Sequence, residues 1–271
     1  AGRGYICGEE TAMLEGLEGR KCMPRFKPPF PAVQGLFGKP TVVNNVETLA
    51  GVPYIIKEGP EAFRRFGTEK SPGTKIFSIS GPVQKAGNYE FPLGISLGRL
   101  IDAAGGVRAG SRVKAILPGG SSVPMLSADH LDLRLDYETV KAAGSQLGTA
   151  GIILIDEAVC IVKAAVILSQ FYFEESCGKC TPCREGTYWI FQTLSRIENG
   201  GGRTDDLGTL LGVCRGISGT TLCALGDTAV LPIMSSVELF REEYEYHIRN
   251  KECPARGMEH KALYTTIMGG P

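Results

Sequence analysis

The chain has 271 residues, of which 43% are hydrophobic and 21% are charged, a composition typical of a globular protein with buried cores. Its 29 basic and 29 acidic residues cancel, so the net charge gives no reason to expect a nucleic acid or an anionic membrane as partner. No apolar run approaches the roughly 18–20 residues that a membrane-spanning helix needs, and direct membrane insertion is therefore not expected.

Residues 1–72 form a first region that is rich in glycine and proline. Acidic residues at the start of a helix face its positive dipole end, which favours a helix beginning at Glu9. In chain order the region is predicted to hold a short strand and turn at 3–8, a helix at 9–18 that Gly19 ends, an irregular loop at 24–40, and a helix from about Val43 that Pro53 should kink or end.

Residues 73–156 form a second region, in which short apolar segments alternate with glycine-rich turns. Such alternation is typical of strands joined by tight turns. Strands are predicted at 75–80, 87–91, 112–117 and 151–156, with a helix at 97–104 before Gly105 and Gly106. This pattern predicts a small α+β unit.

Residues 157–250 form a third region dominated by predicted helices, followed by a tail at 251–271. The apolar periodicity favours helices at 157–174, 184–198, 205–216 and 228–250. Cys160 is placed inside the first of these helices as a small core residue. The three histidines, His130, His247 and His260, are interpreted as surface residues.

The segment E-S-C-G-K-C-T-P-C-R at 175–184 places Cys177, Cys180 and Cys183 at three-residue steps. Nine cysteines and no secretory signal favour metal or cluster binding in a reducing compartment over disulfides. Cys183 lies where a helix is predicted to begin, so its dipole can stabilise thiolates. Structural zinc usually takes two separate C-x-x-C pairs, and the sequence has no second pair. The spacing therefore favours a four-iron 4Fe-4S cluster over zinc.

A fourth thiolate for this cluster must come from elsewhere in the chain. We prefer Cys223, because it lies in a tight loop directly before a helix, whereas Cys214 lies inside one. The other candidates for the fourth ligand are Cys7, Cys22, Cys160 and Cys253.

Stretches near the start of the chain carry some of the groups that a flavin needs. The segment Y-I-C-G-E-E-T at 5–11 precedes a stiff loop, F-K-P-P-F-P at 26–31, which carries a lysine between aromatic side chains. V-V-N-N-V-E-T at 42–48 adds two amides at a predicted helix start. The aromatic wall and the polar amides suit a flavin ring, whereas a glycine-rich loop for the flavin phosphate is not evident in this region.

With these stretches in hand, the chain resembles the NADH-binding flavoprotein subunit of respiratory complex I, the F-subunit family of NADH-quinone oxidoreductases. It is also similar to the diaphorase subunits of NAD-linked hydrogenases and formate dehydrogenases. The resemblance rests on five ordered motifs: Y-I-C-G-E-E-T-A at 5–12, P-R-F-K-P-P-F-P-A at 24–32, G-K-P-T-V-V-N-N-V-E-T-L-A at 38–50, the cysteine segment at 175–184, and C-A-L-G-D at 223–227.

The resemblance implies an α+β, multidomain fold with three parts. These are part of an α/β FMN- and NADH-binding domain at 1–72, a β-grasp, soluble-ligand-binding domain at 73–156, and a helical bundle carrying a 4Fe-4S cluster at 157–250. Relatives also carry an upstream glycine-rich loop of the type G-R-G-G-A-G-F, which is not found in this sequence. The first third of the family chain is therefore expected to be missing, and FMN binding to need a segment supplied from elsewhere.

The resemblance also implies the site residues. FMN is expected against Tyr5, Gly8, Glu9 and Glu10 on one side, Val43, Asn44, Asn45 and Thr48 on another, and Ala224 and Leu225 near the cluster. NADH is expected to stack on FMN and Phe30, with Glu10 and Lys27 holding its polar groups. The cluster ligands are expected to be Cys177, Cys180, Cys183 and Cys223. No catalytic side chain is named, because hydride and electron transfer need no protein acid or nucleophile.

The implied function is an electron-input subunit that oxidises NADH through FMN and passes single electrons to the 4Fe-4S cluster of a respiratory, quinone-reducing complex. Its expected partners are a thioredoxin-like 2Fe-2S subunit and a large iron–sulfur subunit, on the cytoplasmic or matrix side in the peripheral arm of the complex. Two alternatives stay open. One is a diaphorase subunit of a soluble hydrogenase or formate dehydrogenase, and the other is a cluster-only electron-transfer or scaffold remnant.

Overall fold

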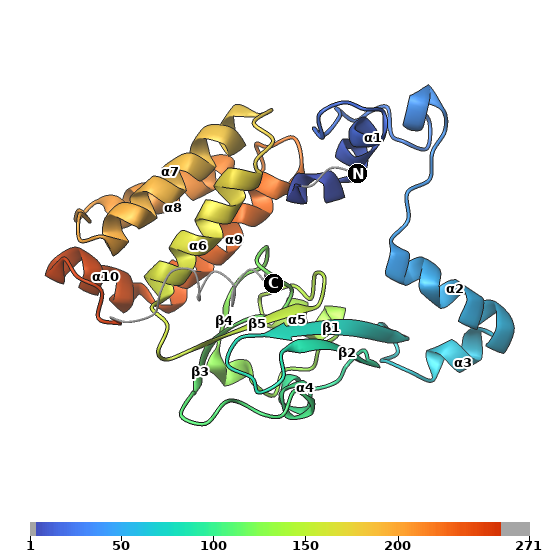
Figure 1. Cartoon of the computed structure of the whole chain (residues 1–271), viewed down its shortest axis with the longest axis horizontal. Helices are drawn as coiled ribbons and strands as arrows, with labels where there is room; N and C mark the ends of the chain where they lie inside the picture. The colour runs from blue at the N-terminus through green and yellow to red at the C-terminus, as the bar shows by residue number, and fades with distance from the viewer. Residues whose placement is uncertain (1–3, 256–271) are drawn as a thin grey trace.

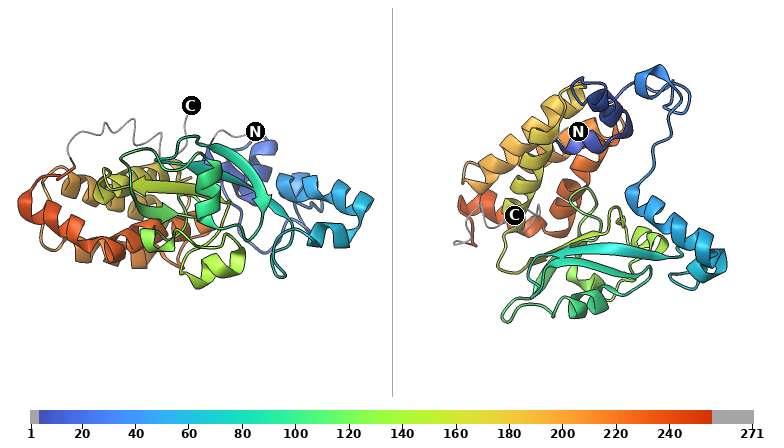
Figure 2. Two further views of the ribbon diagram at one scale, coloured as in Figure 1. Left: turned by 90° about the horizontal axis from the view of Figure 1, so that it is seen from below. Right: turned by 45° about the vertical axis from the view of Figure 1, so that its right-hand side comes forward.

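A computed structural model describes residues 4–255 of the chain. Figure 1 shows three parts: an N-terminal segment with short helices, a mixed sheet, and a bundle of long helices. The sheet lies against the bundle, whereas the helices α2 and α3 project from the body in Figure 1 and in both views of Figure 2. None of the described helices is long and apolar enough to cross a membrane.

The N-terminal segment begins with a 3-10 turn, η1 (Tyr5–Gly8), and helix α1 (Glu10–Leu17). The strand predicted at 3–8 is therefore wrong, because this stretch closes a helical turn onto α1. The Glu9 side chain caps α1 by accepting a hydrogen bond from the backbone N–H of Ala12 at 2.8 Å. The short turn η2 (Leu36–Gly38), helix α2 (Val46–Glu58) and helix α3 (Pro60–Arg64) follow.

Helix α2 continues through Pro53 to Glu58, so the proline does not end it. Asn45 caps this helix by accepting from the backbone N–H groups of Glu47 at 2.9 Å and Thr48 at 3.3 Å. No residue of α2 is buried.

The sheet has five strands in the order β2-β1-β5-β3-β4. β1 pairs antiparallel with β2 and parallel with β5, whereas β3 is antiparallel to both β5 and β4. The strands are β1 (Thr74–Ser80), β2 (Gly87–Pro92), β3 (Val113–Leu117), β4 (Leu126–Ser127) and β5 (Gly151–Asp156). The small helices α4 (Leu97–Ala103) and α5 (Tyr137–Ala142) lie between them in sequence.

Strand β5 joins two hydrophobic cores because successive side chains of a strand point to opposite faces. Ile152 and Leu154 pack into the core of the sheet unit, which also takes in Leu100 of α4 and Val140 of α5. Ile153 and Ile155 pack into the core of the helical bundle. The sheet therefore carries its own helices on one face and the bundle on the other.

The bundle consists of four long helices that run alternately up and down, and a fifth that crosses their end (Figure 1). The bounds are α6 (Ile161–Glu175), α7 (Thr181–Glu198), α8 (Asp206–Ile217), α9 (Ala224–Leu239) and α10 (Arg241–Asn250). Gly186 of α7 lets α8 approach closely, because a Cβ atom there would lie 2.6 Å from the Ile217 Cδ1 atom.

The structure corrects three predictions in this region. The helix predicted at 228–250 is two helices, which separate at Phe240 (φ −127°, ψ 35°). Because α10 turns there, His247 is fully buried and is not a surface residue. Cys160 is buried as predicted, but it is the N-cap residue of α6 and does not lie inside the helix. His130 is partly buried, and His260 lies outside the described residues.

Gly81 provides a test of the contact between β1 and β5. Its φ is +106°, and a Cβ atom there would lie 2.1 Å from the Leu154 carbonyl oxygen. Gly110 has a similar φ of +82° but open space around it. Gly110→Ala should therefore cost only the roughly 1–2 kcal/mol of a left-handed residue, whereas Gly81→Ala should cost clearly more because backbone atoms must move. Hydrogen exchange of the β1 and β5 amides measures how much each variant lowers the free energy of opening of this strand pair. An equal decrease in the two variants would show that the contact at Gly81 is not tight.

Candidate functional site

Four cysteines gather where the bundle meets the N-terminal segment. Cys177 lies in the loop after α6, Cys180 is the N-cap residue of α7, and Cys183 lies in its first turn. Cys223 is the N-cap residue of α9. All four belong to one apolar cluster with Ile6, Ala12, Tyr172, Leu225 and Ala229. The structure thus brings Cys223 to the three closely spaced cysteines.

The surroundings of these thiols suit a bound cationic metal group. Burial raises the pKa of Cys183 to about 11, and the nearby sulfurs of Cys180, Cys223 and Cys177 act in the same direction. Burial also raises the pKa of Cys223, again with Cys177 and Cys180 nearby. Thiolates gathered here need positive charge to be stable, which irons supply directly and the starts of α7 and α9 supply through their dipoles.

The loop that carries Cys177 is fixed by hydrogen bonds that the sequence did not signal. The Ser176 hydroxyl lies 3.3 Å from the Cys183 sulfur and accepts from the Gly178 N–H at 3.3 Å. Arg184 Nη1 donates to the Gly178 carbonyl at 2.9 Å. Gly178 has a φ of +77°, a conformation that favours glycine. The cysteine loop is therefore held in one shape by its own residues.

The N-terminal segment is attached to this loop at two points. The Tyr5 N–H donates to Glu175 Oε2 at 2.5 Å, and the Tyr5 ring lies edge-on to Phe171 with centroids 5.1 Å apart. Lys179 Nζ donates to the Pro24 carbonyl at 2.6 Å and lies 4.9 Å from the centroid of the Phe26 ring. The motifs at 5–12 and 24–32 therefore meet at the cysteine loop, although they are far from it in sequence.

Glu9, Glu10 and Lys27 form a charged group beside this junction. Lys27 Nζ lies 3.2 Å from Glu9 Oε1 and 2.7 Å from Glu10 Oε1. Burial by itself raises the pKa of Glu9, but hydrogen bonds from Thr11, Ala12 and Lys27 outweigh it and the pKa is lowered. The hydrogen bond to Glu10 raises the pKa of Lys27. Glu9 and Lys27 are therefore charged at neutral pH, and both side chains are partly exposed, so a ligand can reach them.

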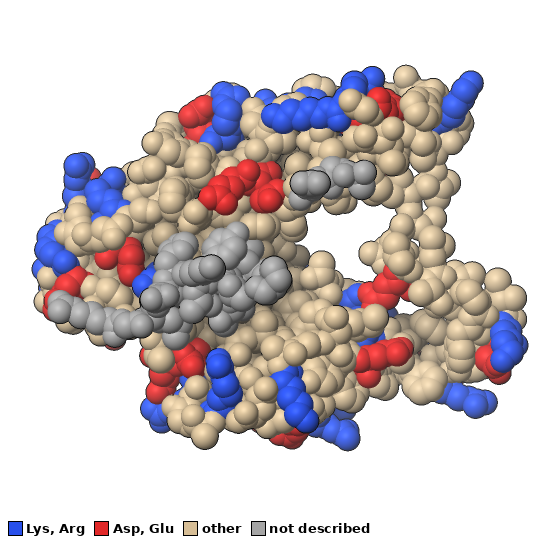
Figure 3. All heavy atoms as spheres, viewed as in Figure 1, with Lys and Arg blue, Asp and Glu red and all other residues tan. Residues whose placement is uncertain are grey.

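The remaining residues predicted for the flavin fall into two sets. Gly8, Phe30 and Ala224 are exposed, as is Tyr5, whereas Leu225 is buried in the apolar cluster. Val43, Asn44, Asn45 and Thr48 lie at the start of α2. An extended segment leads to them, and Figure 3 shows an opening between it and the rest of the molecule. The structure does not bring this second set to the Glu9–Lys27 group.

Helix α2 is attached to the sheet and not to the cysteine end of the bundle. Glu47 accepts from the Ile76 N–H of β1 at 2.8 Å and from Lys75 Nζ at 2.6 Å. Several large apolar side chains of α2 are exposed, including Val46 (81%) and Ile56 (79%). On the face seen in Figure 3, basic and acidic side chains are interspersed, so this face carries no extended patch of one charge.

Three family profiles match the chain in order. Residues 1–54 match the Nuo51 FMN-binding domain. Residues 75–150 match the SLBB domain. Residues 163–247 match the NADH-ubiquinone oxidoreductase-F iron-sulfur binding region.

Similar proteins agree with these profiles. The F subunit of NADH-quinone oxidoreductase from Streptomyces coelicolor is 56% identical over 94% of this chain and 57% of its own length. The F subunit from Mycobacterium bovis is 55% identical over the same shares of the two chains. A crystal structure of an NAD+-reducing NiFe hydrogenase in its H2-reduced state matches with a TM-score of 0.82 at 34% identity, over 95% of this chain and 43% of that one.

The chain spans less than two thirds of these relatives, but the matches cover nearly all of it. They confirm the resemblance drawn from the five motifs and the mixed, multidomain fold class. The chain belongs to the F-subunit family of NADH-quinone oxidoreductases, to which the hydrogenase diaphorases are related.

Proposed function

We propose that this chain forms the part of an NADH-oxidising electron-input subunit that holds a 4Fe-4S cluster and one side of a flavin site. The convergence of Cys177, Cys180, Cys183 and Cys223 at the starts of two helices carries the proposal. The regions at 1–72, 73–156 and 157–250 serve as the partial flavin domain, the β-grasp domain and the cluster-bearing bundle.

The arrangement of the cysteines along the chain supports a cluster over a single zinc ion. Cys177, Cys180 and Cys183 form one C-x-x-C-x-x-C segment, and Cys223 joins them from the start of another helix. Structural zinc usually takes two separate C-x-x-C pairs. A 4Fe-4S cube often takes several closely spaced cysteines and one distant cysteine.

In this proposal the chain contributes positions and charges. FMN, when bound, supplies the step between two-electron hydride transfer and single-electron transfer. Tyr5, Gly8, Glu9 and Glu10 face it on the side of α1, and Phe30 and Lys27 receive the nicotinamide nucleotide. Val43, Asn44, Asn45 and Thr48 complete the flavin site, with Ala224 and Leu225 between it and the cluster. Because α2 stands apart from α1, completing this site requires further protein or a movement of α2.

The partners follow from the same assignment. The Streptomyces and Mycobacterium relatives are named as subunits of an NADH-quinone oxidoreductase, so we propose that this chain works within such a complex. Electrons leaving the cluster pass to a thioredoxin-like 2Fe-2S subunit and a large iron–sulfur subunit, in a peripheral arm on the cytoplasmic or matrix side. The hydrogenase match favours a second candidate, the diaphorase subunit of a soluble NAD-linked enzyme.

Replacing Cys223 tests the cluster. The anaerobically purified chain should contain four irons and four sulfides, as in a 4Fe-4S centre. Cys223→Ser should lose most of them, because one corner of the cube lacks its thiolate. Cys214→Ser is the matched control, since Cys214 is fully buried in α8 and lies outside the group. Iron, sulfide and flavin analyses, with electron paramagnetic resonance of the reduced protein, provide the readout.

The outcomes of these measurements separate the candidates. Loss of iron in Cys223→Ser alone supports the proposed ligand set. Full iron content in Cys223→Ser, or equal loss in Cys214→Ser, would contradict it. Four irons without flavin, even when FMN is added, would favour the cluster-only scaffold for this chain.

The charges beside the flavin provide a further prediction. A carboxylate near the ring disfavours the anionic reduced flavin. Glu10→Gln should therefore raise the reduction potential of the flavin-loaded protein by tens of millivolts. For a two-electron couple, about 30 mV equals about 1.4 kcal/mol. Lys27→Met should lower the potential, because Lys27 partly neutralises Glu10 at 2.7 Å.

Spectroelectrochemical titration of the flavin measures both shifts. Glu61→Gln serves as the control, because Glu61 is exposed in the first turn of α3. Shifts of one sign in both the Glu10 and Lys27 variants, or no shift in either, would refute this assignment of their charges.

A further inference from the structure

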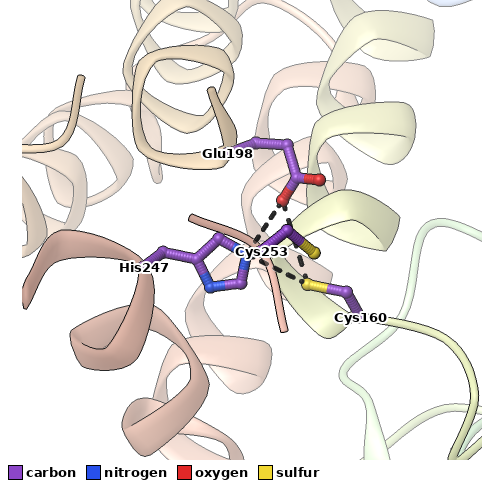
Figure 4. Close-up of side chains that lie close together, drawn as sticks. All are labelled: Cys160, Glu198, His247 and Cys253. Atoms are coloured by element: carbon purple, nitrogen blue, oxygen red, sulfur yellow. Dashed lines mark hydrogen bonds and ion pairs between the residues drawn. The ribbon is translucent and has the colours of Figure 1, made fainter. Parts of the chain in front are cut away.

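A second group of metal-ligand side chains lies at the other end of the bundle. The ligand atoms of Cys160, Glu198, His247 and Cys253 all lie within 4.8 Å of one another. Figure 4 shows the four side chains pointing toward one point, from the N-cap of α6, the end of α7, helix α10 and the segment after α10. Since α7 begins at the four-cysteine group and Glu198 is its last residue, the two groups are separated by the length of an 18-residue helix, roughly 27 Å.

The contacts within this group are short and involve each donor type. The Cys160 sulfur lies 3.4 Å from His247 Nε2 and 3.8 Å from Glu198 Oε2. His247 Nε2 lies 3.1 Å from Glu198 Oε2. Cys160 and His247 are buried, whereas Glu198 and Cys253 are partly buried. The group therefore offers two sulfurs, one nitrogen and one oxygen in a largely enclosed place.

A hydrogen bond from one ring nitrogen of His247 to a backbone carbonyl orients the ring, as is typical of metal-binding histidines. Its Nδ1 atom lies 2.8 Å from the Glu243 carbonyl oxygen, four residues earlier in α10. When Nδ1–H donates to that carbonyl, Nε2 directs its lone pair toward Cys160 and Glu198. A ligating histidine almost always donates its other ring N–H to a carbonyl or carboxylate in this way.

Glu243 also positions the Cys160 end of the group. Its Oε2 atom accepts from the Ile161 N–H at 2.9 Å, next to Cys160, and its Oε1 atom accepts from Lys114 Nζ at 2.8 Å. One residue of α10 therefore fixes both the ring of His247 and the start of α6.

The segment that carries Cys253 is held against the end of α7. A Cβ atom at Gly200 (φ +78°) would lie 2.4 Å from the Lys251 carbonyl oxygen, so only glycine allows this approach. Lys251 adopts a left-handed conformation (φ 59°) and its Nζ donates to the Gly202 carbonyl. The glycine run at 200–202 therefore lets the segment after α10 reach Glu198.

We propose that Cys160, Glu198, His247 and Cys253 bind one structural zinc ion, which fastens the segment after α10 to the ends of α6 and α7. Sulfur, imidazole and carboxylate are the ligands that zinc takes in tetrahedral sites, and four protein ligands close such a site. Magnesium and calcium prefer all-oxygen sites, which this group does not offer. Zinc displaces the thiol protons when it binds.

A group without metal is the competing state. There Glu198 and a protonated His247 form an ion pair, and the two thiols keep their protons. This state predicts no zinc in the purified protein and little change in stability when Cys253 is replaced, because Cys253 is only partly buried and lies outside the helices.

Zinc content and zinc X-ray absorption of the full chain, purified anaerobically from cells supplied with iron and zinc, test the proposal. We expect one zinc per chain, with two sulfurs at about 2.3 Å and two nitrogen or oxygen neighbours at about 2.0–2.2 Å. Cys253→Ser and His247→Gln should lower the zinc affinity by more than the roughly 10–100-fold typical of changes around the ligands. Circular dichroism checks that each variant keeps its helices.

Cys214→Ser and Cys223→Ser are the controls. Both should keep the zinc, while Cys223→Ser alone loses iron, so that failure at the iron–sulfur group and failure at this site are distinguishable. The proposal is wrong if the wild-type chain contains no zinc, if Cys253→Ser binds zinc as tightly as the wild type does, or if the bound zinc has four sulfur neighbours, which would place it at the four-cysteine group.

Discussion

The candidate site depends on one constraint, which is that helices α7 and α9 begin at the same place. Cys180 and Cys223 are the N-cap residues of α7 and α9, so the unpaired N–H groups and positive dipole ends of both helices face the same group of sulfurs. Neither N-cap is satisfied by its own side chain. The alternation of α6 to α9 brings these two starts together, and the close contact of Gly186 with Ile217 fixes the spacing of α7 and α8. The packing that forms the helical bundle therefore also forms the cysteine site.

How much of this could be predicted from the sequence differs between the two ends of the bundle. At the cysteine end, three thiols at a fixed step and a fourth before a helix are local signals, and local signals are enough to propose the set. At the other end no such signal exists. Cys160 precedes α6 without a capping hydrogen bond, and the break at Phe240 involves neither glycine nor proline. The burial of His247 depends on the direction that α10 takes after this break, which only tertiary packing decides.

The N-terminal segment shows the same division. The helix at 10–17 follows from its acidic cap, and the structure has it within one residue of the prediction at each end. The sequence predicts a strand where the structure has the Tyr5–Gly8 turn, because a short apolar pattern does not distinguish a strand from a helical turn. The start of α2 is expected near Val43. The place of α2 in the fold, however, depends on the hydrogen bond from the Ile76 N–H of β1 to Glu47, a contact across 29 residues that no periodicity reveals. Proline at 53 is accommodated because α2 is exposed along its length and can adjust locally.

The two halves of the candidate site differ in how far this chain completes them. The cysteine group is enclosed by its own helices, by Ile6 and Ala12, and by an aromatic pair, Phe171 and Tyr172, at 5.2 Å. The flavin half is open: Asn44 and Asn45 lie at the start of a helix with no buried residue, whose exposed apolar side chains are a surface that other protein can cover. In the proposed function, this chain therefore positions the 4Fe-4S cluster, whereas the flavin site is completed by protein outside helices α1 and α2.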